Sequence, residues 1–207
     1  MYTKSQQQLM TAVKKIVADF FEEYPVTAHG FDHVARVARR AKEIAVEENA
    51  RNVFLCELAG WLHDIGRVPE HTTNTNKRHH ELSYELLKQW YTTYEEFTIL
   101  TQEEKIELLY AVRYHWNNAA CAYDTAWILR DADKLDMFGD IGLHRAQTFF
   151  KDNKEGLSQD MRNHFDAIYW IKTKTAKKIM KTEHLLEPIE AAYKNMLQSK
   201  IEEISLN

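Results

Sequence analysis

The sequence Trp61-Leu62-His63-Asp64-Ile65-Gly66 places an imidazole and a carboxylate side by side at the end of an apolar run. Adjacent residues of a regular helix point about 100° apart, so both side chains reach one ion only where the helix is ending. Gly66 predicts that ending, because glycine readily adopts the left-handed conformation that closes many helices. By itself a His-Asp pair is weak evidence for a site. Its meaning depends on ligand-type residues elsewhere in the chain.

Length and composition predict one helical domain, or one domain with an appendage. The 207 residues are 44% hydrophobic, which is enough to bury a sizeable core. With 6 Gly and 3 Pro, the chain is poor in the turn residues that all-β folds use. The formal net charge is -4, so no basic excess indicates a stable nucleic-acid partner.

Two further features bear on location and redox state. No apolar run approaches the ~20 residues of a membrane span, and the first residues lack the apolar core of a secretion signal. We therefore expect a soluble, cytoplasmic protein without a membrane partner. Cys56 and Cys121 lie in or beside apolar runs and are expected to be reduced core residues.

Apolar residues recur at three- and four-residue spacing and predict an all-α fold. The expected helices cover residues 4–23, 32–49, 52–64, 79–91, 101–114, 124–138, 143–151 and 160–204. Asp32 is expected to cap the second of these, and Thr101-Gln102-Glu103-Glu104 to form a capping box. Residues 67–78 are polar and aperiodic, which predicts a loop that is either a solvated connector or a lid. Pro188 is expected to break or kink the last helix.

Six residues of types that bind metals lie near expected helix ends or on apolar helices: His33, His63, Asp64, His79, His115 and Asp133. Asp133 is informative because it follows the apolar stretch Trp127-Ile128-Leu129, and a buried carboxylate is costly unless paired or metal-bound. The mixed nitrogen and oxygen set suits Mn, Fe, Co, Ni or Zn, and admits Mg. Six ligands are enough for one ion, or for two ions bridged by one carboxylate.

These residues lie in motifs that resemble those of the HD-domain metal-dependent phosphohydrolases. Residues 30–37 (Gly30-Phe31-Asp32-His33-Val34-Ala35-Arg36-Val37) resemble that family's first histidine motif, and residues 59–66 resemble its eponymous motif. Residues 129–139 resemble the subgroup whose last motif reads Asp-Ala-Asp-(Arg/Lys)-Leu-Asp. The resemblance covers about residues 28–150. It implies these ligands of a first metal: His33, His63, Asp64 and Asp133.

The resemblance leaves the second metal open. Residues 79–87 look like a segment of two-metal members that selects His79, and Val112-Arg113-Tyr114-His115-Trp116 resembles the next histidine motif, which selects His115. In one-metal members these positions contact substrate, so each histidine is a candidate ligand, a phosphate or proton-transfer group, or a structural residue. If a second metal binds, Asp64 would bridge the two. The Gly-Tyr-Pro signature of cyclic-di-GMP hydrolases is absent after His115, which argues against that substrate.

The function that the resemblance implies is hydrolysis of a phosphomonoester or phosphoanhydride by attack of metal-bound water. A nucleotide is the expected small phosphorylated substrate, in a monomer or homodimer. The expected catalytic residues are Asp64, Lys134 and Arg145. Asp64 is expected to act as a metal ligand, and Lys134 and Arg145 are included because cations beside a metal site suit phosphate oxygens. Arg67 is either such a cation or a surface charge, and Asp136 either orients a ligand histidine or pairs with an arginine. Two alternatives are a di-iron oxygenase on the same scaffold and a non-catalytic, metal-stabilised signalling or binding module.

The expected organisation is a single compact helical bundle of the HD-domain type. An N-terminal helix at residues 1–27 would pack on an HD metal-binding core at residues 28–150. The C-terminal helices at residues 151–207 would complete the same domain. The tryptophans at core-like positions are expected to serve packing: Trp61, Trp90, Trp127 and Trp170.

Overall fold

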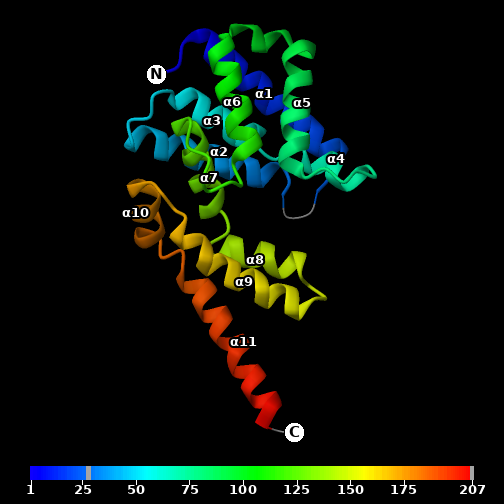
Figure 1. Cartoon of the computed structure of the whole chain (residues 1–207), viewed down its shortest axis with the longest axis vertical. Coiled ribbons are helices and arrows are strands. Elements are labelled where there is room, and N and C mark those ends of the chain that lie inside the picture. The colour runs from blue at the N-terminus through cyan, green and yellow to red at the C-terminus, as the bar shows by residue number, and fades with distance from the viewer. Residues whose placement is uncertain (27–28, 206–207) are drawn as a thin grey trace. The chain divides into compact units, whose positions relative to one another are not determined.

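A computed structural model describes residues 1–26 and 29–205, and over these ranges it contains helices and no strand. This confirms the predicted all-α fold. Figure 1 shows the path of the chain. The elements are α1 (Lys4–Glu23), α2 (Phe31–Glu47), α3 (Val53–Leu62), α4 (Arg67–Thr72), α5 (His79–Thr93), the 3₁₀ helix η1 (Glu95–Ile99), α6 (Gln102–Tyr114), α7 (Asp124–Leu135), α8 (Gly139–Phe149), α9 (Lys154–Tyr169), α10 (Lys174–Thr182) and α11 (Glu187–Ser205).

The chain divides into two compact units, residues 1–133 and residues 134–207. The first unit contains α1 to α6 and most of α7, and the second contains α8 to α11. The predicted scheme of an N-terminal helix, a core at 28–150 and completing helices stays a prediction. Its first boundary, between residues 27 and 28, lies outside the described residues. No helix of the described ranges has the length and hydrophobicity of a membrane-spanning segment.

The first unit is built around α3, whose residues from Phe54 to Leu62 are all buried. Its closest neighbour is α2, which turns a stripe of Val34, Val37, Ala41 and Ile44 into the core. Gly60 permits that approach, because a Cβ there would lie 2.4 Å from the Ala38 Cα. Because α3 is covered on every side, the residues that follow its last turn also lie in the interior. The His-Asp pair stands at that place.

The turn after α3 differs from its prediction. The helix ends at Leu62, and Gly66 is the N-cap of α4. Its φ of -70° lies in the right-handed helical region, so the predicted left-handed conformation is wrong. Space explains the glycine instead. A Cβ on Gly66 would lie 2.1 Å from the His79 carbonyl oxygen and 2.4 Å from the Ser83 nitrogen. The Gly66 N–H also donates to the Ser83 hydroxyl at 2.8 Å. Glycine therefore lets the turn pack against the first turn of α5.

Replacing Gly66 with Ala is expected to lower the free energy of unfolding by about 2 kcal/mol or more, because the added methyl overlaps backbone that cannot move independently. The denaturant midpoint of the variant measures this loss. Gly30→Ala is the milder comparison, since its Cβ would lie 3.2 Å from the Val26 carbonyl oxygen. Equal midpoints for the two variants would contradict this explanation of Gly66.

Other local predictions had mixed outcomes. The capping box is confirmed, because the Glu104 N–H donates to Thr101 Oγ1 at 3.2 Å and the Thr101 N–H donates to Glu104 Oε2 at 2.9 Å. The prediction of a loop at residues 67–78 is wrong for its first half, where the helix α4 forms. Asp32 does not cap α2, since Gly30 is the N-cap and no side chain caps it.

The C-terminal prediction of one helix over residues 160–204 is also wrong. Thr173 begins α10 by accepting a hydrogen bond from the Ala176 N–H at 3.2 Å. Pro188 is the second residue of α11, where the N–H that proline lacks would have no helical partner. Of the two outcomes expected at Pro188, a break is found and a kink is not, because α10 ends at Thr182 and α11 begins at Glu187. Cys56 is buried as predicted, whereas Cys121 and Trp170 are exposed and the core prediction for them is wrong.

Candidate metal centre

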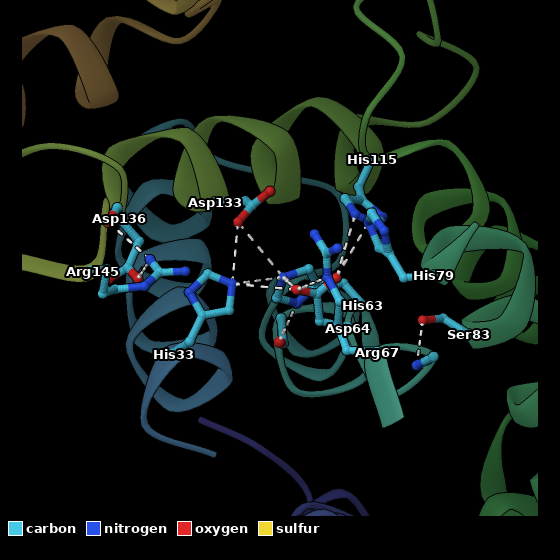
Figure 2. A network of polar contacts seen from close by, with 12 residues as sticks. His33, His63, Asp64, Arg67, His79, Ser83, His115, Asp133, Asp136 and Arg145 are labelled. Atoms are coloured by element: carbon cyan, nitrogen blue, oxygen red, sulfur yellow. Dashed lines mark hydrogen bonds and ion pairs between the residues drawn. The ribbon is translucent and has the colours of Figure 1, made fainter. Parts of the chain in front are cut away.

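All six predicted ligand residues converge in the first unit (Figure 2). They come from the first turns of α2 and α5, the turn after α3, the C-terminal end of α6, and α7. Four of them are almost completely buried: His33, His63, Asp64 and His115. His79 and Asp133 are more open, with 15% and 32% of their side chains exposed. The centre therefore has one side that solvent reaches.

One group of ligand atoms contains Oδ2 of Asp64, Nε2 of His33 and of His63, and Oδ1 of Asp133. Nε2 of His33 lies 3.6 Å from Oδ2 of Asp64, and Nε2 of His63 lies 3.8 Å from it. The two imidazole nitrogens are 3.3 Å apart. Oδ1 of Asp133 lies 3.4 Å from the first and 3.7 Å from the second. Tetrahedral ligands at bonds of about 2.1 Å are about 3.4 Å apart, so these spacings suit a single ion.

A second group lies on the other oxygen of the same carboxylate. Oδ1 of Asp64 is 3.5 Å from Nε2 of His79 and 3.8 Å from Nε2 of His115. His33, His63 and Asp64 form one cluster with metal-binding geometry, and Asp64, His79 and His115 form another. Asp64 thus has one oxygen toward each set of imidazoles, which is the arrangement of a bridging carboxylate.

Backbone carbonyls orient two of the imidazoles. Nδ1 of His63 lies 2.8 Å from the Gly60 carbonyl oxygen, and Nδ1 of His115 lies 2.7 Å from the Val112 carbonyl oxygen. Because a carbonyl can only accept, each Nδ1 carries the proton and donates. In the neutral form of each imidazole, the lone pair of Nε2 is then directed at the centre. Such a hydrogen bond on the far nitrogen is typical of metal-ligating histidines.

The chemistry of the donor set fits a bound cation. Imidazole nitrogens and carboxylate oxygens face one another at 3.3 to 3.8 Å. Oδ1 of Asp64 is buried and accepts no hydrogen bond. Buried acceptors that face one another are unfavourable unless a positive charge lies among them. The residues present therefore fit one or two divalent ions.

The two carboxylates are held in their ionised forms. Burial alone would raise the pKa of Asp64, but the neighbouring His63 and Arg67 hold it well below its usual range. Burial also opposes ionisation of Asp133, and hydrogen bonds from His33 and His63 outweigh it, so this pKa is also well below normal. Both groups are therefore negative near neutral pH, as metal binding requires.

The histidines differ in charge. Burial disfavours the cationic form of His63, but Asp64 and Asp133 outweigh it and raise its pKa to about 9. Burial and the nearby His63 lower the pKa of His115 to about 3. Burial likewise lowers the pKa of His79. Without a metal, a proton on His63 supplies positive charge among the carboxylates, while His115 keeps a free lone pair.

Arg67 and Glu70 support the centre from outside. Nε of Arg67 lies 3.3 Å from Oδ2 of Asp64, and its Nη1 donates to Glu70 at 3.0 Å. Glu70 also accepts from the His79 backbone N–H at 2.9 Å. Glu70 was not predicted, because residues 67–78 were interpreted as a loop. The three-residue spacing from Arg67 was the available indication that both side chains share a helix face.

The other two expected catalytic residues, Lys134 and Arg145, belong to residues 134–207. Lys134 directly follows Asp133 on α7. Arg145, on α8, donates to the Asp136 carbonyl oxygen at 3.0 Å and pairs with the Asp136 carboxylate. Of the two interpretations of Asp136, pairing with an arginine is found. Catalytic roles for Lys134 and Arg145 stay predictions.

Comparisons with known proteins identify relatives of the chain. The model of the HD domain family matches residues 30–137. Bacillus subtilis YpgQ, solved in complex with ADP, is 19% identical and superposes with a TM-score of 0.69 over 95% of this chain and 96% of that chain. A predicted HD superfamily hydrolase from an uncultured Thermotogales bacterium is 26% identical, with a TM-score of 0.57 over 77% and 86% of the two chains. An HD-superfamily hydrolase from Bacillus thuringiensis is 16% identical, with a TM-score of 0.64 over 98% and 100%. No match was found among curated proteins.

Proposed function

The chain belongs to the HD domain family, and on this premise we propose that it is a metal-dependent phosphohydrolase. Its proposed substrate is a phosphomonoester or phosphoanhydride. One observation carries the proposal: the two oxygens of the buried Asp64 carboxylate face separate sets of imidazole nitrogens. Carboxylate bridges of this kind are found in two-metal sites that act on phosphate esters.

The proposed ligands divide between two ions that share Asp64. His33, His63 and Asp133 would hold the first together with Oδ2 of Asp64. The two imidazoles lie near that oxygen, and Asp133 lies near both imidazoles. His79 and His115 would hold the second with Oδ1. When bound, divalent ions at this centre would acidify a water nucleophile and offset the negative charge on phosphoryl oxygens. The mixed nitrogen and oxygen set suits Mn, Fe, Co, Ni or Zn, and admits Mg.

The protein's own cations have separate proposed roles. Arg67 fixes the orientation of Asp64 through its contact with Oδ2, and Glu70 fixes Arg67 in turn. Lys134 and Arg145 are proposed to hold the phosphate or to protonate the leaving group. A guanidinium suits the first task, because its donors match two phosphate oxygens at once.

A nucleotide is the proposed substrate class. The related Bacillus subtilis protein was solved with ADP, which contains a phosphoanhydride bond. Two of the similar solved structures are described as hydrolases of this superfamily. These relatives support nucleoside phosphates as the first compounds to test.

Hydrolysis of a nucleotide panel tests the proposal. Protein loaded with Mn, Co, Ni or Mg is expected to release phosphate or pyrophosphate from at least one nucleoside mono-, di- or triphosphate, and a chelator is expected to stop the release. Absence of activity with every metal, together with no effect of His63→Ala on metal content, would contradict the proposal. Oxygen consumption by iron-loaded protein would favour the oxygenase alternative.

Arg67→Gln is expected to lower kcat/KM by about 10- to 100-fold, because residues that orient a metal ligand typically contribute that much to affinity or activity. Steady-state kinetics at saturating metal measures the loss, and metal titration shows how much of it is weaker binding. Arg162→Gln is the matched control, since Arg162 is exposed and bonds to Gln159 in the other unit. An equal kcat/KM for the two variants would show that Arg67 does not orient Asp64.

A further inference from the structure

Trp116 directly follows the proposed ligand His115 and is the most exposed tryptophan near the centre. Trp116 lies in the turn after α6 and remains 54% exposed. Its indole ring packs against the imidazole of His80, with ring centroids 5.1 Å apart and planes 36° from parallel. One face of the indole is therefore supported, while more than half of the residue's surface is open.

The support for Trp116 is continuous with the centre itself. The His80 ring lies 5.3 Å from that of His79 and 6.4 Å from that of His115. His79 and His115 are 5.4 Å apart and both face Oδ1 of Asp64. A run of contacting aromatic rings thus connects the second group of proposed ligands to the exposed indole, all within residues 1–133.

His80 contributes packing to this run and not a hydrogen bond. Its Nδ1 is buried and has no hydrogen-bond partner. A buried nitrogen without a partner is unfavourable. No hydrogen bond at Nδ1 therefore holds the His80 ring in its position. The ring contact with Trp116 is the interaction that the position provides, and it limits the orientations open to the indole.

We propose that Trp116 binds the aromatic base of a nucleotide substrate by stacking. The inference rests on the proposed phosphohydrolase function and specifies how that site would take its substrate. The phosphates would lie at the metal centre, and the base would lie on the indole face that His80 leaves open. Every base has a π-face, so stacking recognises bases without reading their edges. We therefore expect purines to bind more tightly than pyrimidines, with no strict base preference.

Exposure alone does not distinguish Trp116, and another tryptophan shows why. Trp170 is 55% exposed and lies at the C-cap of α9 in the unit of residues 134–207. It is not next to any proposed ligand in the sequence. The two residues have the same chemistry and the same exposure, which makes Trp170→Ala a matched control for Trp116→Ala.

The test is calorimetric binding of two probes that cannot be hydrolysed, one with a base and one without. The first is α,β-methylene-ADP and the second is methylenediphosphonate. With metal-loaded protein, Trp116→Ala is expected to weaken binding of the first by about 5- to 150-fold and to leave the second unchanged. Trp116→Phe keeps an aromatic face and is expected to retain most of the affinity. Trp170→Ala is expected to change neither.

Four results would overturn the inference. Unchanged binding of α,β-methylene-ADP by Trp116→Ala would show that the indole does not contact the base. Equal losses for both probes, in Trp116→Ala and in Trp116→Phe, would show that the residue supports the centre. A change of oligomeric state by sedimentation with unchanged affinity would assign the ring to a protein interface. Failure of wild-type protein to bind either probe would contradict the proposed function as well, whereas the other three results leave that function standing.

Discussion

Asp64→Asn is expected to lower kcat/KM by about a thousandfold or more. The amide keeps the shape of the side chain but loses the charge and presents an NH₂ group where a ligand oxygen stood. Both groups of imidazoles face this carboxylate, so one substitution weakens both proposed metal positions. Losing several kcal/mol of charge stabilisation on the reacting phosphate corresponds to a loss of this size.

Asp19→Asn is the matched control for this substitution. Asp19 is an exposed carboxylate that pairs with Lys15 on α1 and is not one of the proposed ligands, so its replacement removes the same charge outside the centre. The control is expected to keep full activity and full metal content. Circular dichroism would establish that both variants are folded. Wild-type activity in a folded Asp64→Asn protein would refute the assignment of Asp64.

Saturation with Mn is expected to raise the melting temperature of the unit that contains the centre by about 10 °C relative to chelator-treated protein. An ion at a thousand times its dissociation constant stabilises the folded state by about 4 kcal/mol, and a chain of this length gains about 2–4 °C per kcal/mol. The physical reason is the set of buried acceptors at 3.3 to 3.8 Å, which a cation relieves.

Differential scanning calorimetry with and without metal measures this shift. In Asp64→Asn the shift is expected to fall to less than half, because the shared ligand is gone. In Asp19→Asn it is expected to equal the wild-type shift. A melting temperature that does not respond to any of the transition metals would show that the acceptors bind no ion.

The sequence could indicate six candidate ligands because the information that selects them is local, although their role as ligands stays a prediction. Each histidine or aspartate lies at a recognisable helix end or on an apolar helix, and its side chain suits a metal irrespective of what surrounds it. The six residues do converge in the structure, although they are as far apart in the sequence as His33 and Asp133. Helical periodicity likewise predicted α1 with the boundaries that the structure has, and the Thr-Gln-Glu-Glu motif predicted the capping box of α6.

Features that depend on packing between distant segments could not be predicted. Gly66 suggested a helix ending, but its real constraint is the backbone of α5 at His79 and Ser83, which no local pattern reveals. The link from Arg67 through Glu70 to the start of α5 depends on the short helix α4. The ring contact between His80 and Trp116 joins α5 to the turn after α6, which only the folded chain brings together.

The exposure of two apolar residues was also predicted wrongly from the sequence. Cys121 and Trp170 lie in apolar surroundings in the sequence, yet both are exposed. Trp170 stands at the C-cap of α9, where the chain turns toward α10, and a residue in such a turn faces outward even when its neighbours are apolar. Hydrophobic neighbours predict a buried helix face, but they do not predict which turn residues reach it.

The metal content of the protein tests the central claim most directly. Elemental analysis of Mn-saturated, dialysed protein is expected to give two ions per chain for the wild type. The double variant His79→Ala, His115→Ala is expected to retain one, because His33, His63, Asp133 and Oδ2 of Asp64 still form a complete group. A single ion in the wild type, or an equal content in wild type and double variant, would contradict a centre of two ions bridged by Asp64.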